Sequence, residues 1–307
     1  MDQRPIGLVF PGQGTQRQAM GAAWRDTPSW EITAEISEAT GEDIPDLLLN
    51  ATTEQLRRTD LAQLSVFSVE MIAHAEAVRR GVFGGHVVAC AGHSLGEYAA
   101  LTAAGALTLG DAAALVATRG RAMREASGAR EGTMGVLVAA PLADVEQLVA
   151  DVRERGEDVW VANVNAPGQT VVSGSVDGVG RVGEEAPSIG AKMIRLQVGG
   201  AFHSPYMAPA ADVLATALKE TTTAPRHLPV VANVDARPYD GDSGWTELGV
   251  LQLTSPVLWE ESVRTLTGAL GCARLVELGP GRTLAGLIRR IVPDVEVVSV
   301  DGPAVLD

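Results

Sequence analysis

One short segment constrains the fold of this 307-residue chain more than any other, the sequence Gly92-His93-Ser94-Leu95-Gly96. It matches the G-x-S-x-G turn that carries a nucleophilic serine between a strand and a helix. The apolar run Val87–Ala91 precedes it, and the helix-forming stretch Glu97–Ala100 follows. A chain with 34 glycines can carry this pattern by chance, but the flanking strand and helix favour a strand–turn–helix with Ser94 at its bend.

The glycines of this segment have a physical explanation. A serine on so sharp a turn sits in strained backbone space, and side chains two positions on either side of it would collide. The turn also aims the backbone N–H of Leu95, at the start of the helix, toward the reacting oxygen. We therefore expect Ser94 to be a nucleophile and Leu95 N–H to contribute to an oxyanion hole.

Short apolar runs alternate with longer amphipathic stretches at both ends of the chain, which predicts a mostly parallel sheet with helices on both faces. The strands expected there are Ile6–Phe10, Val87–Ala91, Pro229–Asn233, Arg274–Leu278 and Glu296–Val300. The helices expected there lie around Trp24 and over Leu61–Arg80, Ala112–Ala126 (opening at the N-cap residue Asp111), Met207–Thr221, Glu260–Leu270 and Thr283–Ile291.

The pattern changes near Gly128. Between Thr133 and Val198, β-rich runs alternate with two expected helices in the order β-α-β-β-α-β. This order is typical of a ferredoxin-like unit. We expect such a unit to be inserted into the larger α/β unit.

Composition and charge exclude several classes of function. Lys and Arg number 24 against 38 Asp and Glu, a net charge of −14, so nucleic-acid or membrane binding is not expected. Cys90 and Cys272 cannot form a disulfide framework or a four-thiolate metal site. The first ten residues lack the layout of a signal peptide, and we expect a cytoplasmic protein. The glycine loop Pro11–Gln16 lacks the lysine of a P-loop and the third glycine of a dinucleotide fingerprint.

A nucleophilic serine needs a base, and the chain has five histidines. His203 follows a strand and precedes a helix, in the kind of loop that carries catalytic residues, and is the best candidate. His74 reads as a polar-face residue of a helix, His86 and His227 lie beside strand ends, and His93 shapes the turn. No acid is obviously placed to complete a triad, so an acid from elsewhere in the chain or a backbone carbonyl must orient the imidazole.

Arg119 shares the apolar stripe of its helix with Leu115 and Met123, whereas Arg121 and Arg124 fall on other faces. A guanidinium on a core-facing stripe is costly unless it is paired, and its fork suits a carboxylate. Two interpretations remain open, a structural ion pair and a clamp for a substrate carboxylate. The serine turn just upstream favours the clamp.

The chain resembles the malonyl-CoA:acyl-carrier-protein transacylase family, which includes the acyltransferases of polyketide synthases. Matching motifs occur in family order from residue 11 to residue 281, over essentially the whole chain. They are Pro11–Gln16, Gly92–Tyr98, Arg119-Gly120 (twenty-five residues after Ser94), Asn163–Gln169, Ala201–Ser204, Gln252–Val257 and Glu277–Gly281.

The resemblance implies a role for each matching residue. Ser94 carries the acyl group, His203 is its base, and the main-chain carbonyl of Gln252 orients His203. The N–H groups of Gln13 and Leu95 form the oxyanion hole. Substrate contacts are expected from Arg119, which binds the malonyl carboxylate, and from Phe202, Met123, Asn165 and Gln169.

The family fold has an α/β-hydrolase-like large subdomain with a mostly parallel sheet and an inserted ferredoxin-like small subdomain. We expect the former over residues 1–130 and 199–307 and the latter over residues 131–198. No cofactor and no metal is implied. The partners implied are an acyl-CoA and an acyl carrier protein.

Two positions bear on the choice of substrate. Ala201-Phe202 resembles the malonyl type of the family, in which Phe202 fills the space beside the substrate's α-carbon. An added methyl group would clash there, at a cost of about 1–3 kcal/mol. Gly200 stands where many modular-synthase domains have histidine, and we expect it to enlarge the pocket.

The expected reaction is a ping-pong transfer of malonyl from CoA to the phosphopantetheine thiol of the carrier, by a discrete enzyme of fatty acid or polyketide synthesis. Alternatives are a polyketide-pathway enzyme that loads an unusual extender or moves acyl groups between carriers, a serine thioesterase, and a non-catalytic docking subunit. A basic patch for the acidic carrier is expected among Lys192, Arg195, Arg282, Arg289 and Arg290.

Overall fold

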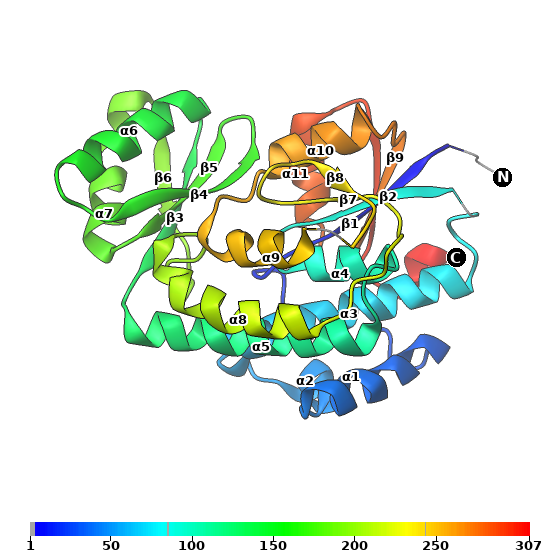
Figure 1. Ribbon diagram of the computed structural model, residues 1–307. Helices are drawn as coiled ribbons and strands as arrows, with labels where there is room; N and C mark the ends of the chain where they lie inside the picture. Colours follow the sequence, from blue (N-terminus) through cyan, green and yellow to red (C-terminus); the bar gives the residue numbers. More distant parts are fainter. Residues whose placement is uncertain (1–3, 85, 243) are drawn as a thin grey trace.

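The larger of two sheets forms the centre of the molecule (Figure 1). The computed structural model describes residues 4–84, 86–242 and 244–307. The first three of the ten N-terminal residues that were considered for a signal peptide lie outside these ranges. The strand order is β10-β9-β1-β2-β7-β8. All neighbours are parallel except β7 and β8. The strands are β1 (Ile6–Phe10), β2 (Val87–Gly92), β7 (Val230–Val231), β8 (Pro238–Tyr239), β9 (Arg274–Leu278) and β10 (Glu296–Val300).

Helices cover both faces of this sheet. The strand β1 is fully buried, and its side chains alternate, with Leu8 and Phe10 in one apolar cluster and Val9 in another. The first cluster includes residues of α3 (Thr59–Arg79), α4 (Gly96–Ala103), α5 (Leu109–Ala129), α8 (Ala208–Glu220) and α9 (Trp245–Thr254). The second includes residues of α10 (Trp259–Thr267) and α11 (Thr283–Ile291). This arrangement confirms the expected mostly parallel α/β sheet.

The smaller lobe is built on a four-stranded antiparallel sheet in the order β4-β5-β3-β6. Its elements are β3 (Thr133–Val138), α6 (Leu142–Glu154), β4 (Val159–Ala166), β5 (Gln169–Gly174), α7 (Val176–Glu185) and β6 (Lys192–Arg195). The order β-α-β-β-α-β confirms the expected ferredoxin-like pattern. We propose the subdomain boundaries at residues 130/131 and 198/199.

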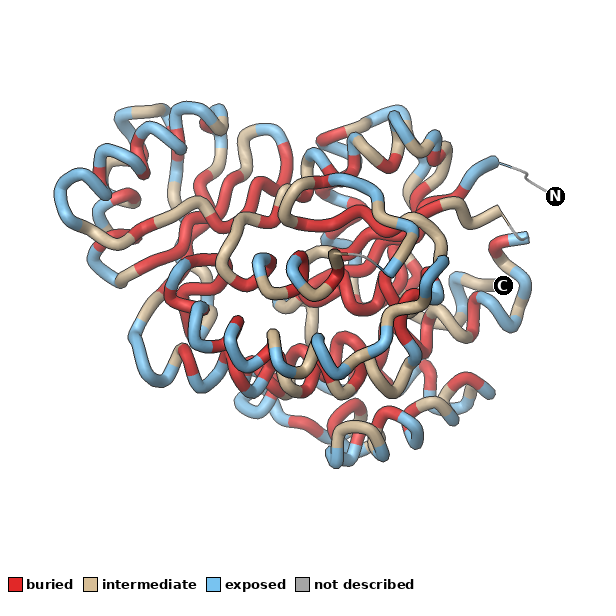
Figure 2. Tube along the Cα trace, viewed as in Figure 1, coloured by how far each residue is buried: buried red, intermediate tan, exposed pale blue. Residues whose placement is uncertain are grey.

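Backbone hydrogen bonds join the two lobes, in addition to the two places where the chain passes from one lobe to the other. Val164 N donates to Val257 O and Val257 N donates to Ala162 O, each at 2.9 Å, so β4 pairs with the segment between α9 and α10. Figure 2 shows buried residues along the strands of both lobes and on the inward faces of the helices. The small sheet is therefore hydrogen-bonded directly to the larger lobe.

The remaining elements are short or peripheral. They are α1 (Ile32–Thr40), α2 (Ile44–Asn50), η1 (Pro28–Glu31), η2 (Gln55–Arg57), η3 (Ala186–Ile189), η4 (Pro205–Met207) and η5 (Pro303–Leu306). The prediction of a helix around Trp24 is wrong, because this fully buried residue lies in a series of turns. Among the described helices, none has the length and apolar character needed to cross a bilayer.

Candidate active site

The turn between β2 and α4 holds Ser94 at φ 54°, a left-handed conformation that is uncommon for a residue other than glycine. A Cβ on Gly92 would lie 1.9 Å from the carbonyl carbon of Gly96, and a Cβ on Gly96 would lie 2.2 Å from the oxygen of Phe10. Both positions therefore require glycine. The crowding expected from the sequence is confirmed, and the main chain of the turn is wedged against the end of β1.

His203 lies directly beside Ser94. Ser94 Oγ and His203 Nε2 are 2.7 Å apart, and His203 Nδ1 is 2.8 Å from the main-chain oxygen of Gln252. A carbonyl oxygen can only accept, so Nδ1 carries the proton and Nε2 accepts from the serine hydroxyl. Burial, reinforced by the positive charge of Arg119, lowers the pKa of His203 to about 3. The imidazole is therefore neutral at physiological pH and arranged as a base.

Arg119 lies behind Ser94 with only 1% of its surface exposed. Its guanidinium donates to Gln63 Oε1 at 2.6 Å and to Gln252 Oε1 and Ser94 Oγ at 3.0 Å each. All three acceptors are neutral, so the described structure does not show the direct ion pair that one interpretation of Arg119 required. A positive charge without a contacting carboxylate therefore adjoins the nucleophile, and this arrangement suits an anionic substrate group.

A cavity of about 250 Å³ opens in front of Ser94, between the small sheet and α11. Seven of the residues singled out from the sequence line it, namely Gln13, Ser94, Met123, Asn165, Gln169, Phe202 and His203. Arg119, Gln252 and Leu95 are buried behind this lining. The structure thus brings the predicted residues together around one cavity.

The sequence matches the family model described as acyl transferase domain over residues 8–300. It is 35% identical to the malonyl CoA-acyl carrier protein transacylase of Bacillus subtilis over 98% of this chain and 95% of that one. It is also 35% identical to the transacylase of the same name from Escherichia coli K12, over 98% of this chain and 97% of that one. The chain belongs to the malonyl CoA-acyl carrier protein transacylase family. It is an acyltransferase.

Solved structures of this family agree with the fold described above. The crystal structure of MCAT from Mycobacterium tuberculosis superposes with a TM-score of 0.92 at 34% identity and covers 98% of both chains. A type II PKS acyl-carrier protein in complex with its malonyl-transacylase, PlMCAT:AntF, includes a chain with a TM-score of 0.91 at 33% identity, covering 98% of this chain and 97% of that one. The α/β fold with its separate antiparallel sheet is therefore a family feature.

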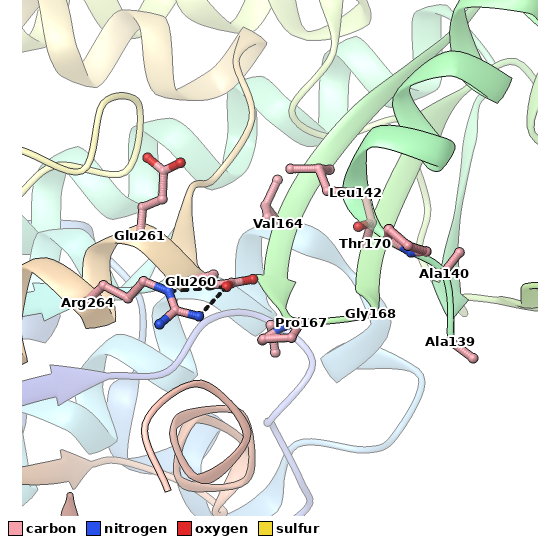
Figure 3. Close-up of a pocket in the computed structure, with 12 residues that line it drawn as sticks. Ala139, Ala140, Leu142, Val164, Pro167, Gly168, Thr170, Glu260, Glu261 and Arg264 are labelled. Atoms are coloured by element: carbon pink, nitrogen blue, oxygen red, sulfur yellow. Dashed lines mark hydrogen bonds and ion pairs between the residues drawn. The ribbon is translucent and has the colours of Figure 1, made fainter. Parts of the chain in front are cut away.

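A wider groove of about 680 Å³ lies elsewhere on this family member, between α10 and the β4–β5 hairpin (Figure 3). Arg264 and Glu260 form an ion pair of 2.7 Å on its α10 side. The opposite side consists of small and apolar residues such as Ala140, Val164 and Pro167. Among its described lining residues there is no serine, cysteine or histidine. The smaller cavity is therefore the candidate active site.

Among the described hydrogen bonds of Ser94 Oγ, His203 is the histidine partner and the other histidines do not take part. His93 Nε2 is 2.9 Å from Asn165 Oδ1, and its ring packs edge-on against Trp259 with ring centres 5.7 Å apart. It thus positions a cavity residue, and its role in shaping the turn stays a prediction. His74 stacks on the ring of Phe83 and meets the ring of Phe10 edge-on. Both nitrogens of His227 approach backbone carbonyls.

Gly200 does not enlarge the cavity as the sequence suggested. A Cβ at this position would lie 2.0 Å from Ser127 Oγ and 3.2 Å from Phe202 Cε1. The space beside Gly200 is thus occupied by α5 and by the ring that lines the cavity. The glycine allows close packing of the loop before His203 on α5.

Asn233 is a site residue that sequence reasoning missed. Its Oδ1 accepts from Ser94 N at 2.7 Å, and its Nδ2 donates to Gly92 O at 2.7 Å. The sequence signal was an asparagine at the end of an expected strand. Only the pairing of β7 with β2 shows that this strand end lies beside the serine turn.

The five basic candidates for carrier docking fall on two elements. Lys192 and Arg195 are exposed on β6, whereas Arg282 precedes α11 and Arg289 and Arg290 lie near its end. Arg290 donates to Gln169 Oε1 at 2.6 Å and to Pro167 O at 2.8 Å, which ties α11 to the β4–β5 hairpin. Among the described residues, no group of three or more His, Cys, Asp or Glu could hold a metal ion.

Proposed function

We propose that the protein transfers a malonyl group from CoA to the phosphopantetheine thiol of an acyl carrier protein through an acyl ester on Ser94. The observation that carries this proposal is Arg119. Its buried charge has no contacting carboxylate in the described structure and donates to Ser94 Oγ. The carboxylate of a malonyl group would supply the missing anion at the distance of a three-carbon acyl chain.

The first half-reaction forms the acyl-enzyme. Ser94 Oγ attacks the thioester carbonyl and gives its proton to His203 Nε2. We assign the N–H groups of Gln13 and Leu95 to the developing oxyanion. As the C–S bond breaks, the leaving sulfur of CoA takes the proton from His203. The Gln252 carbonyl holds the imidazole in the required tautomer throughout.

The second half-reaction reverses the roles. The carrier's thiol gives its proton to His203 Nε2 and its sulfur attacks the ester carbonyl. Ser94 Oγ then leaves and recovers the proton. Serine, imidazole and backbone N–H groups supply nucleophile, base and oxyanion donors, so the proposed reaction needs no cofactor or metal.

We place Phe202 and Met123 against the acyl group and Asn165 and Gln169 along the pantetheine chain, because all four line the cavity. The exposed basic residues of β6 and α11 flank the small lobe and are our candidates for contact with an acidic carrier. CoA thioesters and carrier proteins share the cytoplasm, and we propose that compartment for this enzyme.

The test is a transfer assay with malonyl-CoA and a holo carrier protein. Mass spectrometry measures malonyl-carrier, and a coupled assay measures free malonate. Our proposal predicts malonyl-carrier with little malonate and no product from the Ser94→Ala variant. Release of malonate without malonyl-carrier would support a thioesterase, and the absence of any product would support a non-catalytic docking subunit.

A further inference from the structure

Glu97 is a buried carboxylate three residues after the nucleophile, in the first turn of α4 and 2% exposed. Its Oε1 accepts from the backbone N–H of Asn233 at 2.7 Å, and its Oε2 accepts from Gln252 Nε2 at 2.5 Å. Both of these partners are neutral donors. Burying a carboxylate without a directly bonded cation is costly, and this cost indicates that Glu97 has a function at this position.

The two partners of Glu97 hold the backbone of Ser94 on both sides. Asn233 Oδ1 accepts from Ser94 N at 2.7 Å, and Gln252 Nε2 donates to Ser94 O at 3.0 Å. Ser94 is the residue with the strained φ of 54°. Because a left-handed serine is disfavoured, its conformation persists only when its surroundings determine it. Glu97 bonds to the main chain of Asn233 and to the side chain of Gln252, the two residues whose side chains do so.

The orientation of the Gln252 amide also depends on Glu97. An ionised carboxylate can only accept, so it requires the NH₂ end of the amide to face it. The oxygen end then faces Arg119, whose Nη2 donates to Gln252 Oε1 at 3.0 Å. One amide thus connects the buried negative charge of Glu97 to the buried positive charge of Arg119. A neutral Glu97 can donate a proton instead, and only Arg119 and the carbonyl oxygen of Ser94 then hold the amide in this orientation.

We propose that ionised Glu97 is a positioning residue for acyl transfer, which fixes the Gln252 amide and through it the Ser94 backbone and the Arg119 guanidinium. For malonyl transfer the inference rests on the proposed function. Glu97 acts on the position of Ser94, however, so the same effect is expected for any reagent that reacts with Ser94. Protonation of Glu97 is expected to slow the enzyme.

The charged and titratable groups that face Glu97 come from three elements. Arg119 of α5 favours its ionised form, Asp235 of the β7–β8 turn opposes it, and Tyr98 is its neighbour on α4. Burial outweighs the hydrogen bonds and raises the pKa of Glu97 to about 7. His203 stays neutral down to far lower pH. An acidic limb near neutrality in the rate profile would thus report Glu97 and not the catalytic base.

The test compares the wild type with Glu97→Gln, a variant of the same shape that cannot ionise. Two rates are measured over a range of about pH 5 to 9. One is malonyl transfer to a holo carrier protein. The other is sulfonylation of Ser94 by phenylmethanesulfonyl fluoride, in which Oγ bonds to sulfur, fluoride leaves and the proton passes to His203. The exposed carboxyl of Glu125 on α5 provides the matched control variant Glu125→Gln.

In the wild type and in Glu125→Gln, both rates should fall by up to about tenfold per pH unit below about pH 7 and level off at about the rate of Glu97→Gln. In Glu97→Gln both rates should be about 10- to 100-fold lower near pH 8, because a charge-assisted hydrogen bond is lost. Its profile should also lack the limb near neutrality. A residue with a merely structural role would lower the unfolding temperature and leave the shape of the profile unchanged.

Either of two results would overturn the inference. One is a wild-type sulfonylation rate that stays constant down to about pH 5, and this needs no variant to fold. The other is a Glu97→Gln profile that keeps the wild-type limb. If sulfonylation shows the limb but no malonyl is transferred, the proposed function fails while the positioning role of Glu97 stands.

Discussion

Replacing Arg119 by alanine should change which acyl group the enzyme accepts. The guanidinium is fully charged and 1% exposed, and it is held by the side-chain oxygens of Gln63 and Gln252. A bound malonyl carboxylate would take two charge-assisted hydrogen bonds from it, worth about 1.5–3 kcal/mol each. The variant should therefore lose about 3–6 kcal/mol of transition-state binding for malonyl-CoA, or about 10²- to 10⁴-fold in kcat/KM.

Acetyl-CoA lacks the carboxylate and serves as the reference substrate. Its kcat/KM should change by about tenfold or less in Arg119→Ala, because the contact with Ser94 Oγ is the one contact with a reacting atom that this substrate loses. The assay is the ratio of the two kcat/KM values. Arg119→Lys keeps the charge but cannot donate two parallel hydrogen bonds, so its ratio of kcat/KM values should lie between those of the wild type and Arg119→Ala. The exposed Arg121, on the same helix, provides the control Arg121→Ala.

Equal losses with malonyl-CoA and acetyl-CoA would refute this reasoning. They would mean that the guanidinium acts on the nucleophile and not on the acyl carboxylate. Unchanged kcat/KM values for both substrates in Arg119→Ala would return Arg119 to the structural interpretation, in which it only fills the core between α3 and α9.

Three further predictions concern the packing of Gly200, the choice of acyl group and the pH dependence of stability. Gly200→Ala should lower the free energy of unfolding by about 1–3 kcal/mol, because its Cβ would lie 2.0 Å from Ser127 Oγ, and adding Ser127→Gly should restore most of this loss in chemical denaturation. Phe202→Ala should raise the kcat/KM for methylmalonyl-CoA relative to malonyl-CoA by about 10- to 100-fold, since the ring lines the cavity. Burial lowers the pKa of His74 to about 4, so the unfolded chain binds more protons between about pH 6.5 and 4, and stability should fall there as the pH falls. His74→Gln should show a shallower fall in thermal unfolding across that window, and an unchanged slope would contradict the assignment.

Local pattern was enough to predict the parts of the site that depend on chain neighbours. The strand, turn and helix around Ser94 follow from apolar and glycine spacing, and the stripe of Leu115, Arg119 and Met123 on α5 is buried as its spacing predicts. At the start of α5 the prediction was wrong by one turn. Thr108, not Asp111, is the N-cap, and its hydroxyl accepts from Asp111 N at 3.1 Å. Both residue types cap helices, so only the backbone decides between them.

Contacts between distant segments could not be predicted in this way. The helix α9 carries Gln252, but half of its residues have weak helix preference, and no helix was predicted there. It is helical because it packs on α8, where Gly249 lies so close to Leu218 that a Cβ would come within 2.9 Å of it. The role of Gln252 was therefore available only from the family resemblance.

The central claim is that Ser94 is transiently esterified by a carboxylated acyl group. Intact-protein mass spectrometry after brief mixing with a panel of acyl-CoAs, followed by peptide mapping, tests it most directly. The account predicts a malonyl adduct on the peptide that contains Ser94, its absence from Ser94→Ala, and its discharge when a holo carrier protein is added. An adduct that persists in Ser94→Ala, or an adduct on another residue, would contradict it.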